Sequence, residues 1–244
     1  MPPPDERRLR VDLAAAFRIF AKLGLHEAVA NHLSAAVDAD RGRFLLNPKW
    51  KHFSTIRASD LLLLDTDMAA ADLDPALVDR TAWAIHGRLH RRLPEARVAM
   101  HLHPIAVTAI SCLQHAAILP IEQNTARYWN RVALDTDYAG MADTEQEGDR
   151  LVGLLAGKSR LLMGNHGVLV TSDSIGVAFD DMYTLDRACQ ILVAAYATGQ
   201  PLRVLPPEVA ERTARDWEGI RDFSIAHFEE MKRLLDREDG SYAD

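Results

Sequence analysis

The chain has little of the chemistry that marks secreted, membrane or nucleic-acid-binding proteins. It holds 2 cysteines in 244 residues, too few for a disulfide framework and in keeping with a reducing compartment. Acidic residues outnumber basic ones by 35 to 28, and the net charge of −7 argues against a nucleic-acid or anionic-membrane surface. No apolar run reaches the roughly 18 residues of a membrane-spanning helix. The N-terminus has no apolar signal region, so we expect a cytoplasmic protein without nucleic-acid or membrane partners.

Repeats, low-complexity tracts and linkers rich in Gly or Ser are also absent. Hydrophobic residues make up 48% of the chain, which is long enough to bury a large core without a structural metal. We therefore predict one domain over 1–244, with a core over about 8–205 and a last helix over about 207–237. Any metal in such a chain would serve chemistry rather than hold the fold.

The spacing of apolar residues predicts helices and short strands in irregular alternation. Helices are expected over about 6–23, 76–92, 105–113, 174–198 and 207–237, with another beginning at Thr144. Strands are expected over 32–37, 43–47, 61–65, 97–103 and on both sides of 164–167. Asp5 could cap the first helix, and the turn signal Asp40-Arg41-Gly42 predicts a hairpin between the first two strands. This rhythm favours a mixed or antiparallel sheet covered by helices.

Two histidines lie two positions apart in the segment His101-Leu102-His103-Pro104. Residues at this spacing in a strand point to the same face, so both imidazoles would stand side by side. Two neutral imidazoles in that arrangement can chelate one divalent ion at about 2.0–2.1 Å. Because Pro104 ends the strand, the pair would lie at the edge of the sheet, where a pocket could open.

A third histidine, His166, stands between two apolar runs in the segment Gly164-Asn165-His166-Gly167. The flanking glycines allow a tight turn and a close approach of the backbone to a ligand. His101, His103 and His166 would supply three nitrogens and leave a coordination position open, which is typical of a catalytic metal site. Zinc suits this set best, and manganese, iron or cobalt would also accept it.

His86 and His90 form a rival pair, since four residues on a helix is also a chelating spacing. The basic pair Arg91-Arg92 that follows indicates an exposed face at His90. We interpret His86 instead as a packed residue or as one that supports a metal ligand.

Three segments in register resemble the class II aldolase and adducin family: Ala30-Asn31-His32-Leu33-Ser34, His101-Leu102-His103-Pro104 and Asn165-His166-Gly167-Val168. The likeness covers about residues 8–205. It implies a three-layer α/β/α fold with a largely antiparallel central sheet and a homotetramer with active sites at subunit boundaries. It also implies that the three histidines hold a metal that polarises a carbonyl and stabilises an enolate.

The chain departs from the sugar-phosphate aldolases of that family. Their acidic residue, a metal ligand and proton shuttle, would fall at position 82, which is Ala82. Bulky Trp50 stands where a small residue of a phosphate loop is expected, so a phosphorylated sugar does not fit. The resemblance leaves four substrate-binding candidates, and Arg80 or the nearby Lys49 could pair with a carboxylate. Those candidates are Asn31, Ser34, Arg80 and Thr81.

The segment 120–131 resembles the bacterial branch of the family rather than its sugar aldolases. Glu122 is a candidate for the missing acid, and Tyr128 is a candidate proton donor, across a subunit boundary if the chain is a tetramer. The alternative is a structural role without catalysis: interface packing for Tyr128 and Trp129, and surface salt bridges for Glu122 and Arg131.

The sequence thus predicts a metal-dependent carbon–carbon lyase, an aldehyde-lyase or a carboxy-lyase. Its substrate would be a small oxygenated compound that carries a carboxylate. Because Ala82 replaces the acidic residue, decarboxylation is favoured over aldol cleavage: loss of carbon dioxide needs no proton abstraction from the substrate. The alternatives are a ferrous-iron oxygenase on the same scaffold and a non-catalytic, adducin-like binding module.

Overall fold

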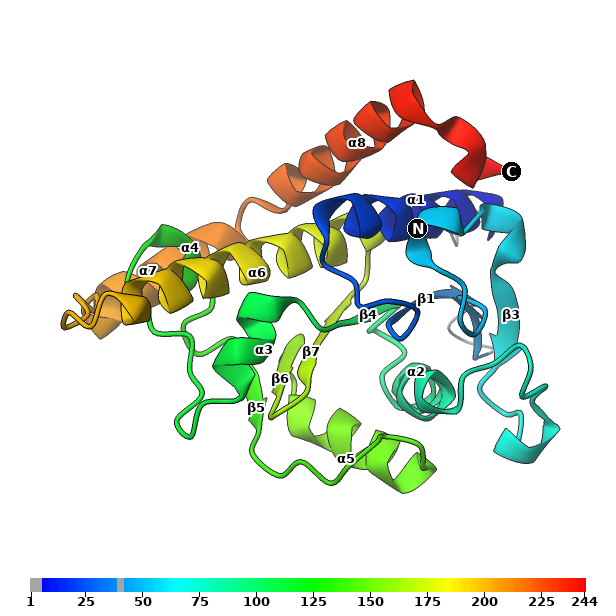
Figure 1. The fold of residues 1–244 in the computed structure, drawn as a ribbon, viewed down its shortest axis with the longest axis horizontal. Helices are drawn as coiled ribbons and strands as arrows, with labels where there is room; N and C mark the ends of the chain where they lie inside the picture. Colours follow the sequence, from blue (N-terminus) through cyan, green and yellow to red (C-terminus); the bar gives the residue numbers. More distant parts are fainter. Residues whose placement is uncertain (1–5, 39–41) are drawn as a thin grey trace.

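The computed structural model describes residues 6–38 and 42–244, and its centre is one seven-stranded sheet (Figure 1). The strand order is β3-β2-β1-β4-β7-β6-β5. Every neighbouring pair is antiparallel except β5 and β6, which are parallel. The strands are β1 (His32–Asp38), β2 (Arg43–Leu46), β3 (Leu62–Asp65), β4 (Val98–Leu102), β5 (Ala133–Asp135), β6 (Arg160–Met163) and β7 (Gly167–Ser172).

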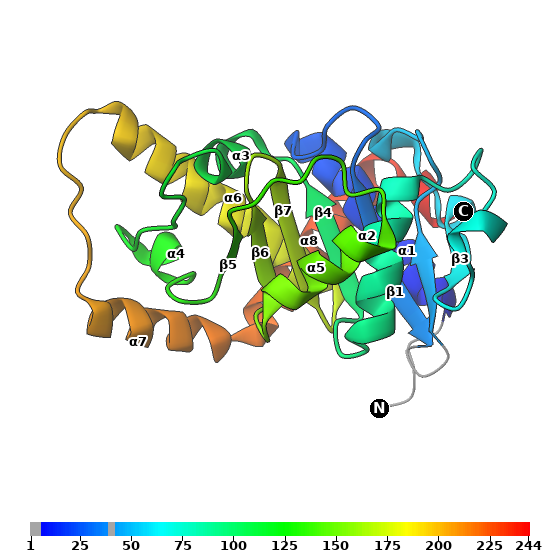
Figure 2. The same cartoon turned by 90° about the horizontal axis from the view of Figure 1, so that it is seen from below.

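Helices cover both faces of this sheet (Figures 1 and 2). The helices α1 and α6 lie on one face and α2 and α5 on the other, while α8 packs across α1 and α6. The helices are α1 (Glu6–Leu23), α2 (Arg80–Arg92), α3 (Ile105–Ser111), α4 (Gln123–Ala126), α5 (Glu145–Leu155), α6 (Ile175–Ala197), α7 (Pro207–Glu218) and α8 (Arg221–Glu238). The predicted layered α/β fold with a mostly antiparallel sheet is confirmed. In the part of the chain that the structure describes, no helix could span a membrane.

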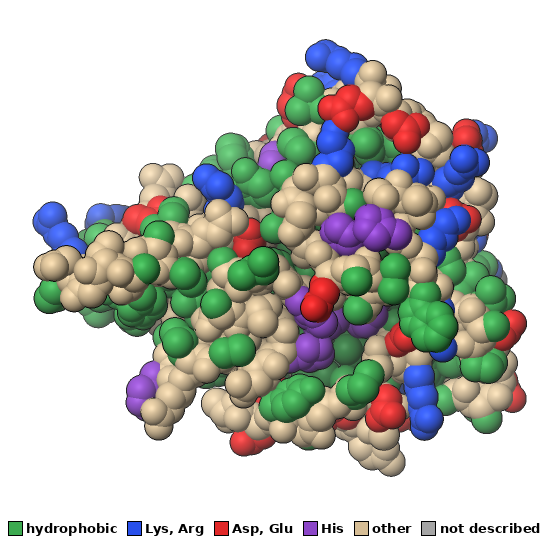
Figure 3. Space-filling model, in the orientation of Figure 1, with side chains coloured by type: hydrophobic (Ala, Val, Ile, Leu, Met, Phe, Trp, Pro, Cys, Tyr) green, Lys and Arg blue, Asp and Glu red, His purple; other side chains and the backbone are tan. Residues whose placement is uncertain are grey.

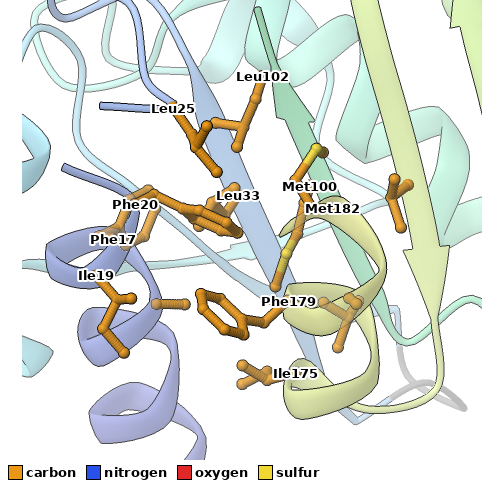
Figure 4. Packing of buried hydrophobic residues seen from close by; sticks show 14 of the residues in the cluster. Phe17, Ile19, Phe20, Leu25, Leu33, Met100, Leu102, Ile175, Phe179 and Met182 are labelled. Carbon is orange, nitrogen blue, oxygen red and sulfur yellow. The ribbon is translucent and has the colours of Figure 1, made fainter. Parts of the chain in front are cut away.

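The main hydrophobic core lies between the sheet and the helices α1 and α6. Phe17 and Phe20 from α1 meet Phe179 and Met182 from α6 above the strand residue Met100 (Figure 4). A second core, which includes Ala99, fills the space between the sheet and the helices α2 and α5. Because neighbours in a strand face opposite sides, Met100 and Leu102 point into the first core, and His101 faces the second side with Ala99.

The predicted hairpin is confirmed by the antiparallel pairing of β1 with β2. Its turn residues Asp40 and Arg41, like the proposed cap Asp5, lie outside the described residues. The helix predicted to begin at Thr144 is confirmed as α5, and the Thr144 hydroxyl caps it by accepting a hydrogen bond from the backbone N–H of Glu147 at 3.2 Å.

The structure corrects two predicted helices. The one predicted over 76–92 begins at Arg80, because the carboxylate of Asp79 caps it by accepting from the N–H groups of Thr81 and Ala82. The predicted last helix is two helices, α7 and α8, which break at Gly219 and Ile220. The sequence interpretation missed β5 and α4, three and four residues long, which are too short for a periodic signal.

Candidate metal centre

His101 and His103 lie at the end of β4, near the middle of the sheet. Antiparallel pairing sets His101 opposite Leu169 of β7 on one side and opposite His32 of β1 on the other. His103 follows one residue after β4 ends, and Pro104 then precedes α3. The two-residue spacing brings both imidazoles to one face, and their ring centroids lie 4.7 Å apart.

His166 lies in the tight turn that joins β6 to β7. Asn165 takes a left-handed conformation with φ of 56°, which is unusual for a residue with a side chain. At Gly167 a Cβ atom would stand 2.6 Å from Cδ2 of His103 and 2.7 Å from the carbonyl oxygen of Leu102. Only glycine therefore lets this turn pack against the end of β4 and bring the third imidazole to the other two.

The three predicted metal ligands converge in the structure. One nitrogen from each of His101, His103 and His166 lies within 4.8 Å of the other two. Ring centroids of His166 lie 4.8 Å from His101 and 4.6 Å from His103. On the face shown in Figure 3, histidine side chains gather near its centre. Two segments more than sixty residues apart thus form one cluster.

Hydrogen bonds on the outer sides of two rings fix which nitrogen is free. His101 donates from Nδ1 to the carbonyl oxygen of Val168 at 3.1 Å. His103 binds the carboxylate of Glu27 through Nδ1 at 2.5 Å, and a carboxylate can only accept. When both rings are neutral, their Nε2 atoms, 2.9 Å apart, face each other as two lone pairs. Two unprotonated nitrogens at this distance repel each other unless a cation lies between them.

Burial keeps two of the three rings, His101 and His166, neutral. Desolvation, with the neighbouring His32 imidazole next, holds the pKa of His101 well below its usual value. Desolvation and then His103 lower the pKa of His166 to about 4. Neutral imidazoles are the form that binds a metal, so at neutral pH His101 and His166 need lose no proton to do so.

A buried chain of polar side chains continues from this cluster between the sheet and α2. His32 of β1 bonds to His86, and Ser34 bonds to both His86 and His90. The prediction of an exposed face at His90 is wrong, since its side chain is only 4% exposed and lies against Phe44. The basic pair after it reaches solvent, but α2 turns His90 inward. His86 is buried, as expected for a packed residue, and its hydrogen bonds go to His32 and Ser34 rather than to one of the three candidate ligands.

The comparisons with known proteins agree with this architecture. The model of the class II aldolase and adducin N-terminal domain matches residues 11–193. The chain belongs to this family. A Caulobacter vibrioides protein named for the class 2 aldolases is 32% identical over 241 residues, which cover 98% of this chain and 93% of that protein.

Two solved structures of the class II aldolase superfamily share the fold over nearly the whole chain. An aldolase II superfamily protein from Pseudomonas syringae matches with a TM-score of 0.89 and 30% identity, over 99% of this chain and 97% of that one. The L-fuculose 1-phosphate aldolase from Glaciozyma antarctica matches with a TM-score of 0.83 and 25% identity, over 99% and 96%.

Relatives of this class II aldolase chain carry names of different reactions. The decarboxylase NovR of Streptomyces niveus is 29% identical over 83% of this chain and 74% of its own length. A Streptomyces roseochromogenus protein, named as a 4-hydroxy-3-prenylphenylpyruvate oxygenase and 4-hydroxy-3-prenylbenzoate synthase, is 28% identical over 83% and 73%. Membership of the family therefore fixes the scaffold but not the reaction.

The four predicted substrate-binding residues have different surroundings. Asn31 is 1% exposed; its Oδ1 accepts from the backbone N–H of Glu27, and its Nδ2 is buried without a partner in the described chain. The substrate-binding role predicted for Ser34 is corrected, because its hydroxyl is held between two imidazoles and is not available to a ligand. Arg80 is exposed at the start of α2, and Thr81 donates its hydroxyl to Asp79 at 2.6 Å.

Neither predicted acid–base residue lies with the histidines. The carboxylate of Glu122 caps the short helix α4 by accepting from the backbone N–H groups of Asn124 and Thr125. Tyr128 belongs to the core on the α1 and α6 side, opposite to the face of His101. Its hydroxyl donates to Asp181, and at 2% exposure it cannot reach across a subunit boundary.

Arg131 forms the salt bridges that were the alternative to a catalytic role for segment 120–131. It forms ion pairs with Glu211 and Glu218 of α7, so it ties segment 120–131 to that helix.

Ala82 is 2% exposed on α2, so the chain supplies no acidic side chain at the position where sugar-phosphate aldolases carry one. Trp50 is 69% exposed in a left-handed turn with φ of 59°.

Glu27 is the contact that the sequence interpretation missed. It lies 76 positions from His103 and belongs to no recognisable motif, so only the folded chain brings its carboxylate to the ring. The same segment holds Asn31, whose side chain accepts from the N–H of Glu27. A carboxylate behind a metal-binding imidazole orients the ring and increases its basicity.

Proposed function

We propose that this protein is a cytoplasmic, metal-dependent carbon–carbon lyase that acts on a small oxygenated carboxylate. The observation that carries the proposal is the convergence of one nitrogen from each of His101, His103 and His166 within 4.8 Å of one another, with the Nε2 atoms of His101 and His103 2.9 Å apart. Two nitrogens that bind one ion at about 2.0–2.1 Å lie near this separation.

The donor set fits a divalent transition metal. Three neutral imidazole nitrogens suit zinc first, and manganese, iron or cobalt next, whereas magnesium and calcium prefer oxygen ligands. An ion held by His101, His103 and His166 would polarise a substrate carbonyl and stabilise the negative charge that develops on its oxygen. The supporting groups, Glu27 and the Val168 carbonyl, hold two of the rings in place for it.

Residues around the cluster would bind the substrate. The Asn31 amide has a buried N–H group without a partner in the described chain, and an unmade hydrogen bond of this kind costs about 1–3 kcal/mol. A substrate carboxylate would satisfy that donor only if the segment around Asn31 opens, since the Nδ2 atom is closed to solvent in the described chain. Arg80 would add positive charge at the mouth of the site from the first turn of α2.

Between the two lyase reactions we favour decarboxylation. Loss of carbon dioxide requires no base to abstract a carbon-bound proton, and α2 carries Ala82 rather than an acid. The decarboxylase among the relatives supports this choice. The oxygenase among the relatives keeps ferrous-iron oxygen chemistry as a second candidate, which the all-nitrogen donor set also accepts.

The experiment removes the ligands one at a time. Metal content and zinc affinity are measured for the purified protein and for His101→Ala, His103→Ala and His166→Ala. Each variant should lose more zinc affinity than the roughly 10- to 100-fold that is lost when a residue supporting a metal ligand is removed. The matched control is His115→Ala, an exposed histidine outside the cluster.

Turnover is then screened with hydroxy and keto acids, including 3-keto acids, in which loss of carbon dioxide leaves the negative charge on the carbonyl oxygen that the metal would stabilise. Carbon dioxide release and oxygen uptake are recorded in parallel. Metal-dependent carbon dioxide release without oxygen uptake supports the lyase, and oxygen uptake with iron supports the second candidate. Unchanged zinc affinity in all three alanine variants would refute the metal centre itself.

A further inference from the structure

A small cavity on the α6 side of the sheet is lined by three arginines that the proposed function leaves unused. It measures about 180 Å³ and lies where the break between α7 and α8 meets β6 and α6. Arg127 and Arg160 are nearly buried there, whereas Arg221, the first residue of α8, is half exposed. Three positive charges around one small space repel each other, so each needs an acidic partner or a bound anion.

Two buried aspartates of α6 balance part of this charge from outside the cavity. Asp181 accepts a hydrogen bond from Nε of Arg160 at 2.5 Å, and Asp180 accepts one from Nη2 of Arg127 at 2.9 Å. Neither aspartate lines the cavity. These ion pairs hold the two guanidinium groups in place, and each occupies only part of its group.

Most N–H groups of these two arginines have no acceptor in the described chain. A guanidinium carries five N–H groups in a planar fork. Arg160 donates only from Nε, so both of its terminal nitrogens are without an acceptor. Arg127 donates only from its terminal nitrogens, to Asp180 and, at 3.4 Å, to the hydroxyl of Thr184. None of the unpaired nitrogens is closed to solvent, so they are open to water or to a ligand in the cavity that both residues line.

The one acidic residue among the described residues that line the cavity is Glu218, and its charge is already balanced. Both of its carboxylate oxygens accept from Arg131, which does not line the cavity. Arg221 donates to Asp173 from a single terminal nitrogen, which leaves its other N–H groups available. The cavity therefore offers several charged donors and no unpaired carboxylate to receive them.

We propose that this cavity binds a tetrahedral oxyanion of the phosphate type. Guanidinium groups bind phosphate oxygens through pairs of parallel hydrogen bonds, and they do so best when their planes are held in place. Arg127 follows α4, Arg160 begins β6 and Arg221 begins α8, so the three groups belong to three different elements. An anion with oxygens in several directions can bridge them, whereas a planar carboxylate has two oxygens to offer.

The site is separate from the proposed metal centre. Arg160 pairs with α6 on one face of the sheet, whereas His101 points to the opposite face. Trp217 of α7 lies over the guanidinium of Arg127 at 5.2 Å, and Arg221 lies just beyond the break that follows this helix. A bound phosphate would therefore tie the junction of α7 and α8 to β6.

Calorimetric titration of the metal-free protein with inorganic phosphate tests the site. We expect one saturable site with a Kd on the order of 0.1–1 mM, and much weaker binding of acetate. Absence of saturable phosphate binding up to about 10 mM overturns the proposal. Binding of acetate as tight as that of phosphate also overturns it, because a planar carboxylate would then suffice.

Arg160→Gln should lower the phosphate affinity by about 10- to 100-fold, as expected for lost charge-assisted hydrogen bonds. Because this change takes the buried Asp181 from its nearest partner, Arg221→Gln provides a second test that leaves the interior intact. There we expect a loss of about two- to fivefold, since the side chain is half exposed. The matched control is Arg212→Gln, exposed on α7 and outside the cavity. Unchanged affinity in Arg221→Gln, or an equal loss in Arg212→Gln, overturns the proposal.

Two further titrations locate the ion and identify its source. His101→Ala should bind phosphate as the wild type does, and a loss of affinity in this variant would place the ion at the histidines and overturn the proposal. Glycerol 3-phosphate is the second ligand. Binding at least as tight as that of inorganic phosphate supports the phosphoryl group of a metabolite as the ligand, and weaker binding supports the free ion.

Discussion

At the scale of single residues, the carboxylate of Glu27 connects the N-terminal part of the chain to the proposed metal centre. It accepts from Nδ1 of His103 at 2.5 Å and is itself exposed to solvent. Such a contact is weak as a surface ion pair but matters for orientation, because it fixes which nitrogen of His103 faces the cluster.

Glu27→Ala should therefore lower zinc affinity by about 10- to 100-fold with little change in stability. Competition with a chromophoric chelator gives the affinity, and urea unfolding of the apo protein gives the stability. Glu95→Ala, which removes another exposed carboxylate, serves as the control. Equal affinity in the two variants would mean that Glu27 does not orient His103.

The buried imidazoles of His32, His86 and His90 make stability depend on pH. Burial holds their pKa values below 6.5 in the folded protein, so the unfolded chain binds more protons as the pH falls. The stability due to their neutral form is complete above pH 6.5 and declines as the pH drops from there toward 3.

Each of the three should lower the free energy of unfolding of the apo protein by about 1.4 kcal/mol between pH 8 and 5.5. Urea unfolding at a series of pH values measures this slope. His101 and His166 add to the same slope, so His90→Asn should reduce the total fall between pH 8 and 5.5 by about 1.4 kcal/mol. A slope that is the same in this variant would contradict the neutral, buried state assigned to His90.

At the scale of elements, the close packing of the β6–β7 turn against the end of β4 decides whether the third ligand meets the other two. Gly167 is the position where no side chain fits, because a Cβ would approach His103 Cδ2 to 2.6 Å and the Leu102 carbonyl to 2.7 Å. The backbone oxygen cannot move without disturbing the pairing of β4 with β7.

Gly167→Ala should therefore separate His166 from His103 and lower zinc affinity by at least about tenfold, the scale of losing a supporting contact. Gly153→Ala is the matched control, since its Cβ would meet nothing within 4 Å on the helix α5. That variant should bind zinc normally and gain about 0.5–1 kcal/mol of stability. Normal zinc binding in Gly167→Ala would show that the turn tolerates a side chain.

At the scale of the whole molecule, large apolar side chains lie exposed on the surface of the described chain. Ile105 is 87% exposed at the start of α3, two residues after His103, and Met141 is 76% exposed. Apolar side chains this exposed are typical of surfaces that other subunits cover. We therefore keep the prediction of a homotetramer with active sites at subunit boundaries.

Light scattering after size exclusion should give four times the 27.2 kDa mass of the chain. Ile105→Lys should shift the protein toward smaller species, because a buried charge without a partner is costly at an interface. Lys158→Ala, far from this surface in sequence and exposed, provides the control. A monomeric wild type would contradict the prediction.

The sequence by itself determined the scaffold and the three candidate ligands. Period-two spacing placed His101 and His103 on one face of a strand, and glycines around His166 required a turn there, because these are local rules of backbone geometry. The spacing rules gave only a mixed or antiparallel sheet covered by helices, and the resemblance of three motifs to the class II aldolase and adducin family implied the three-layer fold.

Only the tertiary structure decided what surrounds those ligands. Glu27 meets His103 across 76 positions, and α2 turns His90 inward despite the basic pair after it. Glu122 and Tyr128, which carry plausible chemistry, are committed to a helix cap and to a buried hydrogen bond. Contacts of this kind depend on how faces pack in three dimensions, and no spacing along the chain encodes them.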